Sequence, residues 1–369
     1  MGLLFRLFYI VEAGLATIQS MQDYIKGRGS QINTPNRFNA QAFVLEHFEG
    51  IDDLPDPDPG TEVFIDEPKQ IVNKVESTDL PFLYSLNPYQ GCEHGCAYCY
   101  ARNVHTYWGF SAGLDFERKI IVKPNAPKLL EEFINKKNYE PASMSLSGNT
   151  DCYQPLERRY KITRGLLEVF LRHRHPVGII TKNSLILRDL DLLTELASMQ
   201  LVRVYLSITT LDEELRRTLE PRTSSSLNRL KAVRALTDHG VPVGVMTAPI
   251  IPGLNSDEIP DLLKAAADHG AIAAGYTMVR LNGDVKDIFA DWLSKNRPDA
   301  ARKVWNQIRH AHGGSVSDSR PGVRMRGEGN IANSVNQLFK LFQRKYFGDN
   351  KMPDYDFSKF IKGGQLTLF

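Results

Sequence analysis

The chain has 369 residues, of which 42% are hydrophobic and 24% are charged. This length exceeds that of a usual single-core domain, but it suits an α/β barrel with extensions. The formal net charge is +2 at pH 7, so the overall charge gives no sign of nucleic-acid binding. Only four cysteines occur and three of them are clustered, which excludes a disulfide-rich secreted domain and indicates a reduced, cytoplasmic protein.

The first 80 residues lack the pattern of a folded core. Residues 1–20 are apolar, but Arg6 and Glu12 interrupt a run that is too short to span a bilayer. We expect an extra or mispredicted leader rather than a membrane anchor, with Met21 as an alternative start. Residues 21–80 are rich in turn formers and include a stretch of acids and prolines. This composition predicts an N-terminal extended arm, which either wraps the following domain or stays a disordered tail.

Short apolar runs alternate with amphipathic stretches in the middle of the chain. The predicted strands are Phe82–Leu86, Ala142–Leu146, Val177–Thr181, Val202–Ile208, Val241–Ala248 and Ala271–Val279. The predicted helices lie near 125–137, 162–174, 188–199, 224–239 and 256–269. Strands that alternate with helices indicate a parallel sheet. We therefore predict an α/β fold over residues 81–295, a partial (β/α)6 TIM-like barrel whose reactive groups lie at the carboxyl ends of its strands.

One stretch, Asn87–Tyr100, holds three cysteines in the spacing C-x3-C-x2-C: Cys92, Cys96 and Cys99. Thiolates are soft ligands that suit zinc or an iron–sulfur cluster. A closed zinc site usually needs four ligands, and no second cysteine pair is present, so His94 would have to complete it. The three can also be unrelated structural thiols. Alternatively, three cysteines can hold three irons of a [4Fe-4S] cubane and leave the fourth iron open to a small molecule.

This spacing, with an aromatic residue just before the last cysteine, resembles the radical S-adenosylmethionine (radical SAM) superfamily. The resemblance implies that the open iron binds the amino and carboxylate groups of S-adenosylmethionine. An electron from the cluster then releases a 5′-deoxyadenosyl radical, which implies an electron donor such as flavodoxin or ferredoxin. Tyr98 and Tyr100 flank Cys99 and are candidates for a hydrogen-transfer route, with packing around the cluster as the alternative.

A second segment, Ser147–Glu157, directly follows the second predicted strand. It resembles the N-T-D-P-Y-Q-P-x-E run of radical SAM proteins related to spore photoproduct lyase, which implies that Asn149 and Thr150 bind the cofactor. A turn that caps the next helix is the alternative. Cys152 stands where those relatives more often carry proline, and the lyase's hydrogen-donating cysteine falls at Gly148. The lyase's donor is therefore not preserved, and Cys152 is only a candidate catalytic residue.

Three further candidates follow later strands. The resemblance implies that Lys182 meets the cofactor carboxylate, that Ser207 contacts the cofactor, and that Ile251 lies against its adenine. The alternatives are a solvated rim lysine, an ordinary strand-end serine and a plain turn built on prolines and glycine. The motif Glu220–Arg222 is either a salt-bridged turn or an anion-binding arginine.

The C-terminal part has two features of its own. Residues 301–345, within a predicted basic helical extension over 296–350, carry nine Lys and Arg against two acids. Such a local field can track a phosphate backbone, and a solvated face is the alternative. In the tail, 351–369, Gln365–Phe369 resembles the Q-L-x-L-F peptide by which bacterial DNA-maintenance proteins bind the sliding clamp. A terminal strand packed on the body is the alternative.

Together these features predict a lyase-like radical SAM enzyme with a [4Fe-4S] cluster and S-adenosylmethionine, acting on nucleic acid as in DNA repair. A radical SAM enzyme for a protein or small molecule is one alternative. A non-enzymatic, metal-stabilised binding module is the other.

Overall fold

The computed structural model describes residues 24–36, 38 and 60–364. The predicted leader, 1–20, and the clamp-like peptide, Gln365–Phe369, lie outside the described residues, and both stay predictions.

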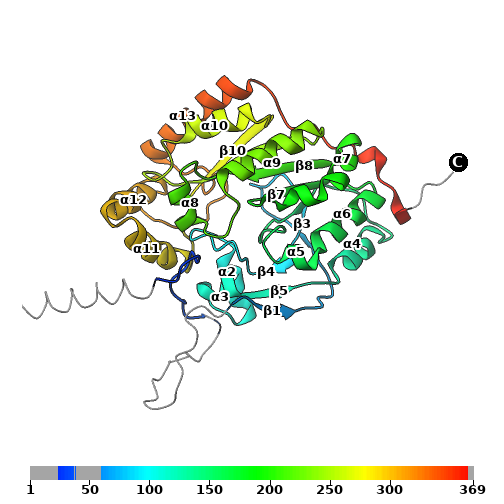
Figure 1. Cartoon of the computed structure of the whole chain (residues 1–369), viewed down its shortest axis with the longest axis horizontal. Helices are drawn as coiled ribbons and strands as arrows, with labels where there is room; N and C mark the ends of the chain where they lie inside the picture. Colours follow the sequence, from blue (N-terminus) through cyan, green and yellow to red (C-terminus); the bar gives the residue numbers. More distant parts are fainter. Residues whose placement is uncertain (1–23, 37, 39–59, 365–369) are drawn as a thin grey trace, which may run out of the picture.

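A seven-stranded sheet forms the centre of the molecule, in the order β10-β9-β8-β7-β6-β3-β2 (Figure 1). Its strands are β2 (Val72–Lys74), β3 (Tyr84–Leu86), β6 (Met144–Leu146), β7 (Val177–Thr181), β8 (Val202–Ser207), β9 (Val243–Ile250) and β10 (Ala273–Met278). Six of them are parallel, and β2 pairs antiparallel with β3 at one edge. The parallel strands are the six that the sequence predicts, so the α/β prediction is confirmed.

Helices cover the sheet in the expected positions. These are α4 (Ala126–Ile134), α6 (Ile162–Arg172), α7 (Leu190–Ser198), α9 (Ser226–Asp238) and α10 (Ile259–Asp268), with the shorter α5 (Glu157–Tyr160) and α8 (Glu213–Leu219) between them. Two of them begin at side-chain caps. Ser225 accepts a hydrogen bond from the Asn228 N–H at α9, and Asp212 accepts from Glu214 and Leu215 at α8.

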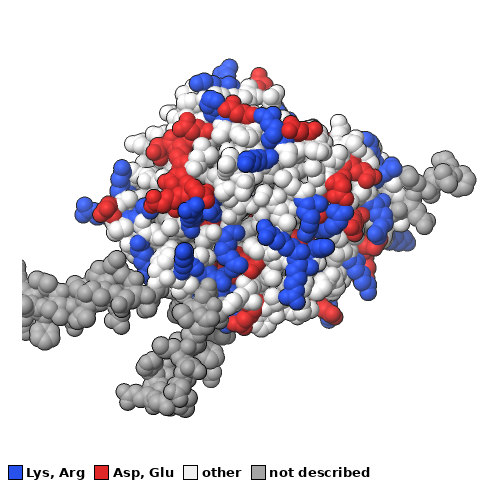
Figure 2. All heavy atoms as spheres, viewed as in Figure 1, with Lys and Arg blue, Asp and Glu red and all other residues white. Residues whose placement is uncertain are grey.

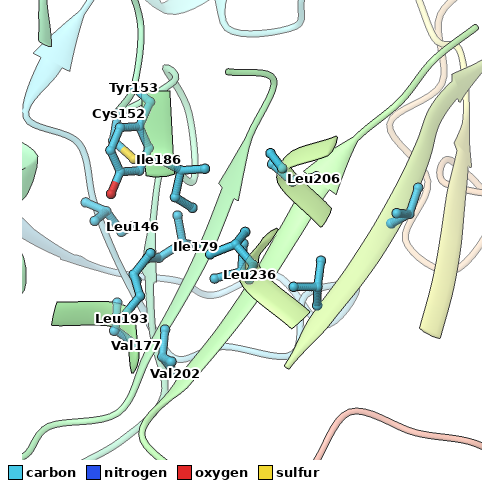
Figure 3. Close-up of a cluster of buried hydrophobic side chains, with 14 of the residues drawn as sticks. Leu146, Cys152, Tyr153, Val177, Ile179, Ile186, Leu193, Val202, Leu206 and Leu236 are labelled. Carbon is cyan, nitrogen blue, oxygen red and sulfur yellow. The ribbon is translucent and has the colours of Figure 1, made fainter. Parts of the chain in front are cut away.

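The core lies between the sheet and these helices. Alternate strand residues such as Val177 and Ile179 are buried, because successive strand side chains point to opposite faces. Figure 3 shows them packed with Leu193 and Leu236 from the covering helices. This apolar packing fixes the strands and therefore the positions of their carboxyl ends.

A second, three-stranded sheet carries the cysteine loop. It has the order β1-β5-β4, with β1 (Glu62–Ile65), β4 (Tyr89–Gln90) and β5 (Lys119–Val122). Between β4 and β5 lie α2 (Arg102–His105), a 3₁₀ turn at Thr106–Trp108 and α3 (Leu114–Arg118). The sequence analysis did not predict this sheet, because strands of two to four residues show no clear periodicity. Since β1 comes from the arm, this part of the arm packs on the body.

Three helices follow the last strand: α11 (Val285–Asn296), α12 (Pro298–Ala311) and α13 (Gly329–Phe347). The loop between α12 and α13 reaches the opposite edge of the sheet, where Arg324 Nε lies 2.6 Å from Asp79 Oδ2. The Gly322 N–H donates to Asp79 Oδ1 at 2.7 Å. This loop therefore links the β10 edge to the segment after β2 and bridges the open side of the barrel.

The distribution of surface charge and the character of the helices are relevant to binding of nucleic acid and of membranes. Figure 2 shows basic and acidic side chains interspersed over the face in view, with several Lys and Arg gathered over α5. None of the described helices has the length and apolar character needed to cross a membrane.

Candidate functional site

The cysteine loop, residues 91–101, lies at the carboxyl ends of the parallel strands. The Ala97 N–H donates to the Leu219 carbonyl at 3.0 Å, and the Glu93 N–H donates to Gln154 Oε1 at 2.9 Å. Leu219 and Gln154 both belong to segments that follow strand ends, β8 and β6. The loop therefore lies across the end of the barrel where reactive groups are expected.

Glycines shape the loop. Gly91 and Gly95 have φ angles of 80° and 67°, values that other residues rarely adopt. An added Cβ at Gly95 would lie 2.7 Å from Glu117 Oε2. Backbone hydrogen bonds tighten the loop, because the Gly95 N–H donates to the Cys92 carbonyl at 3.4 Å and the Cys99 N–H donates to the Cys96 carbonyl at 3.3 Å. Burial raises the pKa of all three loop thiols, so cluster binding must displace their protons.

The donor set fits a cluster better than a single metal ion. Among the described residues, no three His, Cys, Asp or Glu side chains are close enough to share one metal ion. Zinc needs all its ligands in one coordination sphere, whereas a cubane binds each thiolate at a different iron. Local backbone hydrogen bonds, from the Gly95 N–H to the Cys92 carbonyl at 3.4 Å and from the Cys99 N–H to the Cys96 carbonyl at 3.3 Å, hold the three cysteines in one tight loop. These residues fit a [4Fe-4S] cluster.

His94 is held by protein groups on both ring nitrogens. Asn183 Nδ2 donates to His94 Nε2 at 3.2 Å, because Asn183 Oδ1 already accepts from Leu185 and Ser224. The ring proton is therefore on Nδ1, which lies 3.4 Å from Asp151 Oδ2. This arrangement argues against His94 as a zinc ligand.

Asp151 joins the loop to the ends of β6 and β7. Its carboxylate accepts from Thr181 Oγ1 at 2.7 Å and from the Lys182 N–H at 2.8 Å. Burial alone would raise the pKa of Asp151, but His94 and these hydrogen bonds lower it to about 2. The carboxylate is therefore charged at neutral pH and acts as a fixed acceptor.

Lys182 faces the cysteine loop. Its Nζ lies 5.8 Å from the centroid of the Tyr98 ring. Burial would lower the pKa of Lys182, but Cys96, Glu220 and Cys99 raise it above its ordinary value. In the part of the chain that the structure describes, no carboxylate lies within 4.0 Å of the ammonium. Such a half-buried cation can bind the carboxylate of a ligand, and the predicted contact of Lys182 with the cofactor stays a prediction.

The hydroxyl of Tyr98 is hydrogen-bonded to a buried carboxylate. Its hydroxyl donates to Glu220 Oε1, which also accepts from Thr209 at 2.6 Å, while Arg229 holds Glu220 Oε2 at 2.7 Å. Burial would raise the pKa of Glu220, but Arg229, Lys182 and the hydrogen bonds lower it to about 2. Arg222 lies 3.3 Å from Glu93, so the Glu220–Arg222 motif is a salt-bridged turn.

The other predicted cofactor contacts occupy the same end of the barrel. Thr150 Oγ1 donates to the Tyr89 carbonyl at 2.6 Å, and the Asn149 N–H donates to Asn87 at 2.8 Å. Both residues therefore tie the strand-end turn to the segment before the loop. Ser207 is buried at the end of β8, and Ile251 packs in one apolar cluster with Cys96 and Tyr98.

The remaining candidates differ in exposure. Tyr100 is 51% exposed, and its hydroxyl donates to the Gly148 carbonyl at 2.7 Å. Cys152 is fully buried in the main core with Leu146, Ile179 and Ile186 (Figure 3). Its placement favours packing over chemistry, and its catalytic role stays a prediction.

The sequence analysis missed three residues of this region. Arg102 and Glu117 form a fully buried ion pair at 2.5 Å beside the cysteine loop, and Arg280 follows β10 at the barrel end. In the sequence each of them stands out only as a charged residue near apolar ones. The local pattern does not show that Arg102 and Glu117 form an ion pair.

Comparisons with known proteins agree with this geometry. The family model of the radical SAM superfamily matches residues 86–266. "Uncharacterized protein Rv2578c" of Mycobacterium tuberculosis is 34% identical over 234 residues, which are 63% of this chain and 69% of that protein. "Uncharacterized protein MJ0683" of Methanocaldococcus jannaschii is 27% identical over 224 residues, 61% of this chain and 80% of that protein.

Solved structures show the same fold. The structure "Spore photoproduct lyase complexed with dinucleoside spore photoproduct" aligns with a TM-score of 0.57 and 16% identity, covering 78% of this chain and 80% of that chain. The partial-barrel prediction and the family prediction are thus confirmed by independent comparisons. With its C-x3-C-x2-C loop at the carboxyl ends of six parallel strands, the chain belongs to the radical SAM superfamily.

Proposed function

We propose that this protein is a lyase-like radical SAM enzyme that acts on nucleic acid. The observation that carries the enzyme assignment is the position of Lys182. Among the described residues it has no ion pair, and it lies beside a loop of three cysteines at the reactive end of the barrel. A structural metal site has no use for such a group, so the binding-module alternative is less favoured.

In this proposal each residue type has one task. Cys92, Cys96 and Cys99 hold the [4Fe-4S] cluster, which supplies an electron for reductive cleavage of S-adenosylmethionine when both are bound. Lys182 binds the cofactor carboxylate as a charge-assisted partner. Ser207 and Ile251 line the cofactor's place, one as a polar contact and the other as an apolar surface. A small electron-transfer protein such as flavodoxin or ferredoxin would reduce the cluster.

The surroundings of Arg280 support the proposal that the substrate is anionic. Its Nη1 donates to the Met325 sulfur at 3.1 Å, and a thioether is a weak acceptor. Within the described residues no carboxylate lies within 4.0 Å of its guanidinium, whereas Arg324 nearby is paired with Asp79. Burial and the charge of Arg324 lower the pKa of Arg280. A half-buried guanidinium that lacks a counter-ion favours binding of a phosphate.

The fold adds a second argument for nucleic acid. The aligned lyase binds a dinucleoside photoproduct, and the basic extension supplies further positive charge. The missing cysteine at Gly148 argues against an identical reaction. A protein or small-molecule substrate stays the alternative.

A binding and turnover experiment tests the proposal. Anaerobically reconstituted, reduced protein should form 5′-deoxyadenosine slowly from S-adenosylmethionine, and ultraviolet-irradiated DNA should raise that rate. Arg280→Gln should weaken binding of a DNA oligonucleotide by about tenfold, a loss of about 1.4 kcal/mol. Arg172→Gln is the matched control, because Arg172 is exposed on α6, outside the basic extension, and is paired with Glu131 at 2.5 Å. Equal binding by the two variants, with no stimulation by DNA or RNA, would contradict a nucleic-acid substrate.

A further inference from the structure

A short piece of the N-terminal arm touches the backbone of the cysteine loop. A Cβ added to Gly29 would lie 1.5 Å from the Gly95 carbonyl oxygen and 3.1 Å from the Ala97 nitrogen. At this distance only glycine fits. The two backbones are therefore in direct contact, although the residues are far apart in the sequence.

The same piece of the arm is tied to a buried carboxylate. Glu117 is fully buried, and it accepts from the Gly29 N–H at 3.1 Å and the Ser30 N–H at 2.7 Å. Arg28 Nη1 donates to the Glu117 carbonyl at 3.1 Å. Three consecutive residues of the arm thus converge on one residue of α3.

Glu117 in turn holds the residue that fixes the loop. Arg102 Nη2 donates to Glu117 at 2.5 Å and to the Gly95 carbonyl at 3.1 Å, while Arg102 Nε donates to the Cys96 carbonyl at 2.9 Å. The Arg102 N–H donates to the Cys99 carbonyl at 3.3 Å. One arginine therefore binds three carbonyls of the loop, those of Gly95, Cys96 and Cys99.

The arm continues along the outside of the loop region. The Ile32 carbonyl accepts from the Leu114 N–H at 3.2 Å, and a Cβ on Gly113 would lie 1.9 Å from that carbonyl. Thr34 Oγ1 donates to Asp284 at 3.2 Å, beside the start of α11. Residues 28–34 thus run from the cysteine loop past α3 to α11, and we call this segment the strap.

We propose that the strap is a functional part of the cluster site, in which Gly29, Arg102 and Glu117 are positioning residues for the cysteine loop. The strap holds the loop in its ligand-binding conformation and covers its outer face. This inference rests on the proposed cluster at Cys92, Cys96 and Cys99. It predicts that a change in the strap, outside the barrel core, alters the cluster.

The test compares two glycine substitutions in the arm. Gly29 has a φ outside the left-handed region, so Gly29→Ala adds a methyl group against Gly95 without straining its own backbone. Gly60→Ala is the matched control, because no atom of the described residues lies within 4 Å of its added Cβ. Both full-length variants are reconstituted anaerobically. The measurements are iron and sulfide content, the cluster reduction potential, and the rate of loss of visible absorbance in air.

We expect Gly29→Ala to lose its absorbance about fivefold faster in air, the effect of losing about one hydrogen bond that holds the loop closed. Its reduction potential should also shift, because hydrogen bonds to cluster sulfurs set that potential. Gly60→Ala should behave like the unchanged protein. Equal air sensitivity and equal potential in all three proteins would overturn the inference.

Two further results distinguish a failure of the strap proposal from a failure of the proposed function or of folding. If the unchanged protein forms no cluster, the proposed function fails and not the strap alone. If Gly29→Ala does not fold, Arg28→Met provides a second variant, since it removes the guanidinium that donates to the Glu117 carbonyl and keeps an unbranched side chain. It should shift air sensitivity in the same direction by about twofold, and no change in it would count against the strap.

Discussion

The cysteines of this protein lie in two contrasting regions. Cys92, Cys96 and Cys99 belong to a loop whose shape depends on glycines, buried charges and directional hydrogen bonds. Cys152 lies in the core, surrounded by aliphatic side chains from the strands and helices (Figure 3). The same residue type therefore occupies two environments that differ in polarity and in the kind of contact that stabilises them.

This contrast has an energetic basis. An apolar core is stabilised by the area it removes from water, and its contacts have no preferred direction. The loop depends on polar groups that are costly to bury unless each has its partner. Substitutions in the core should therefore change the free energy of unfolding, whereas substitutions around the loop should change the cluster.

The largest difference should appear between the two kinds of cysteine. Changing Cys92, Cys96 or Cys99 to alanine should abolish the cluster, while reconstituted unchanged protein holds about four irons per chain. Cys152→Ala should keep its iron, because the core thiol is separate from the loop. Iron and sulfide analysis decides this, and loss of iron in Cys152→Ala would remove the distinction between the two regions.

A substitution in the core should lower stability and leave the iron content unchanged. Leu193 is fully buried, so Leu193→Ala should lower the free energy of unfolding by about 2–5 kcal/mol through lost burial and a cavity. Its iron content should stay unchanged well below the melting temperature. Leu227→Ala is the control, since Leu227 is 57% exposed and its loss should cost less than about 0.5 kcal/mol. Denaturant titration of the apo-protein gives both values.

Lys182→Ala tests the electrostatics at the loop. The variant should bind S-adenosylmethionine about tenfold more weakly or worse, which is about 1.4 kcal/mol, with intact iron content. Lys128→Ala is a suitable control, because the Lys128 side chain is 77% exposed on α4. Unchanged affinity of Lys182→Ala in equilibrium binding would show that the lysine does not meet the cofactor carboxylate.

A further contrast concerns the pH dependence of stability. Burial lowers the pKa of His105, next to the loop region, and of His175, in the core, to about 4 from the ordinary 6.5. Between these values the unfolded chain binds more protons than the folded one, so stability should fall as pH falls through this window.

Single substitutions can show how much of the loss of stability at low pH comes from each histidine. His105→Gln and His175→Gln should each flatten the fall in stability between about pH 6.5 and pH 4, because each removes one depressed titration. A slope that neither substitution changes would assign the effect to other groups. Below about pH 4 both variants should lose stability alike, as Asp151 and Glu220, with pKa values of about 2, are protonated.

The sequence alone determined the fold class and the location of the cysteine site. Strands such as Val177–Thr181 and Val202–Ser207 were predictable because the repeat of side-chain burial is a local property of the chain. The spacing of Cys92, Cys96 and Cys99 was equally local. Lys182 was recognisable because it directly follows a predicted strand.

Only the tertiary structure decided what surrounds that site. Gly29 and Glu117 are 88 residues apart, and Arg324 and Asp79 are 245 apart. No local pattern encodes such pairs, because the partners meet only after the sheet has brought the segments together. The placement of Cys152 in the core, the ion pair of Arg102 with Glu117, and the strap over the cysteine loop all follow from packing between distant segments.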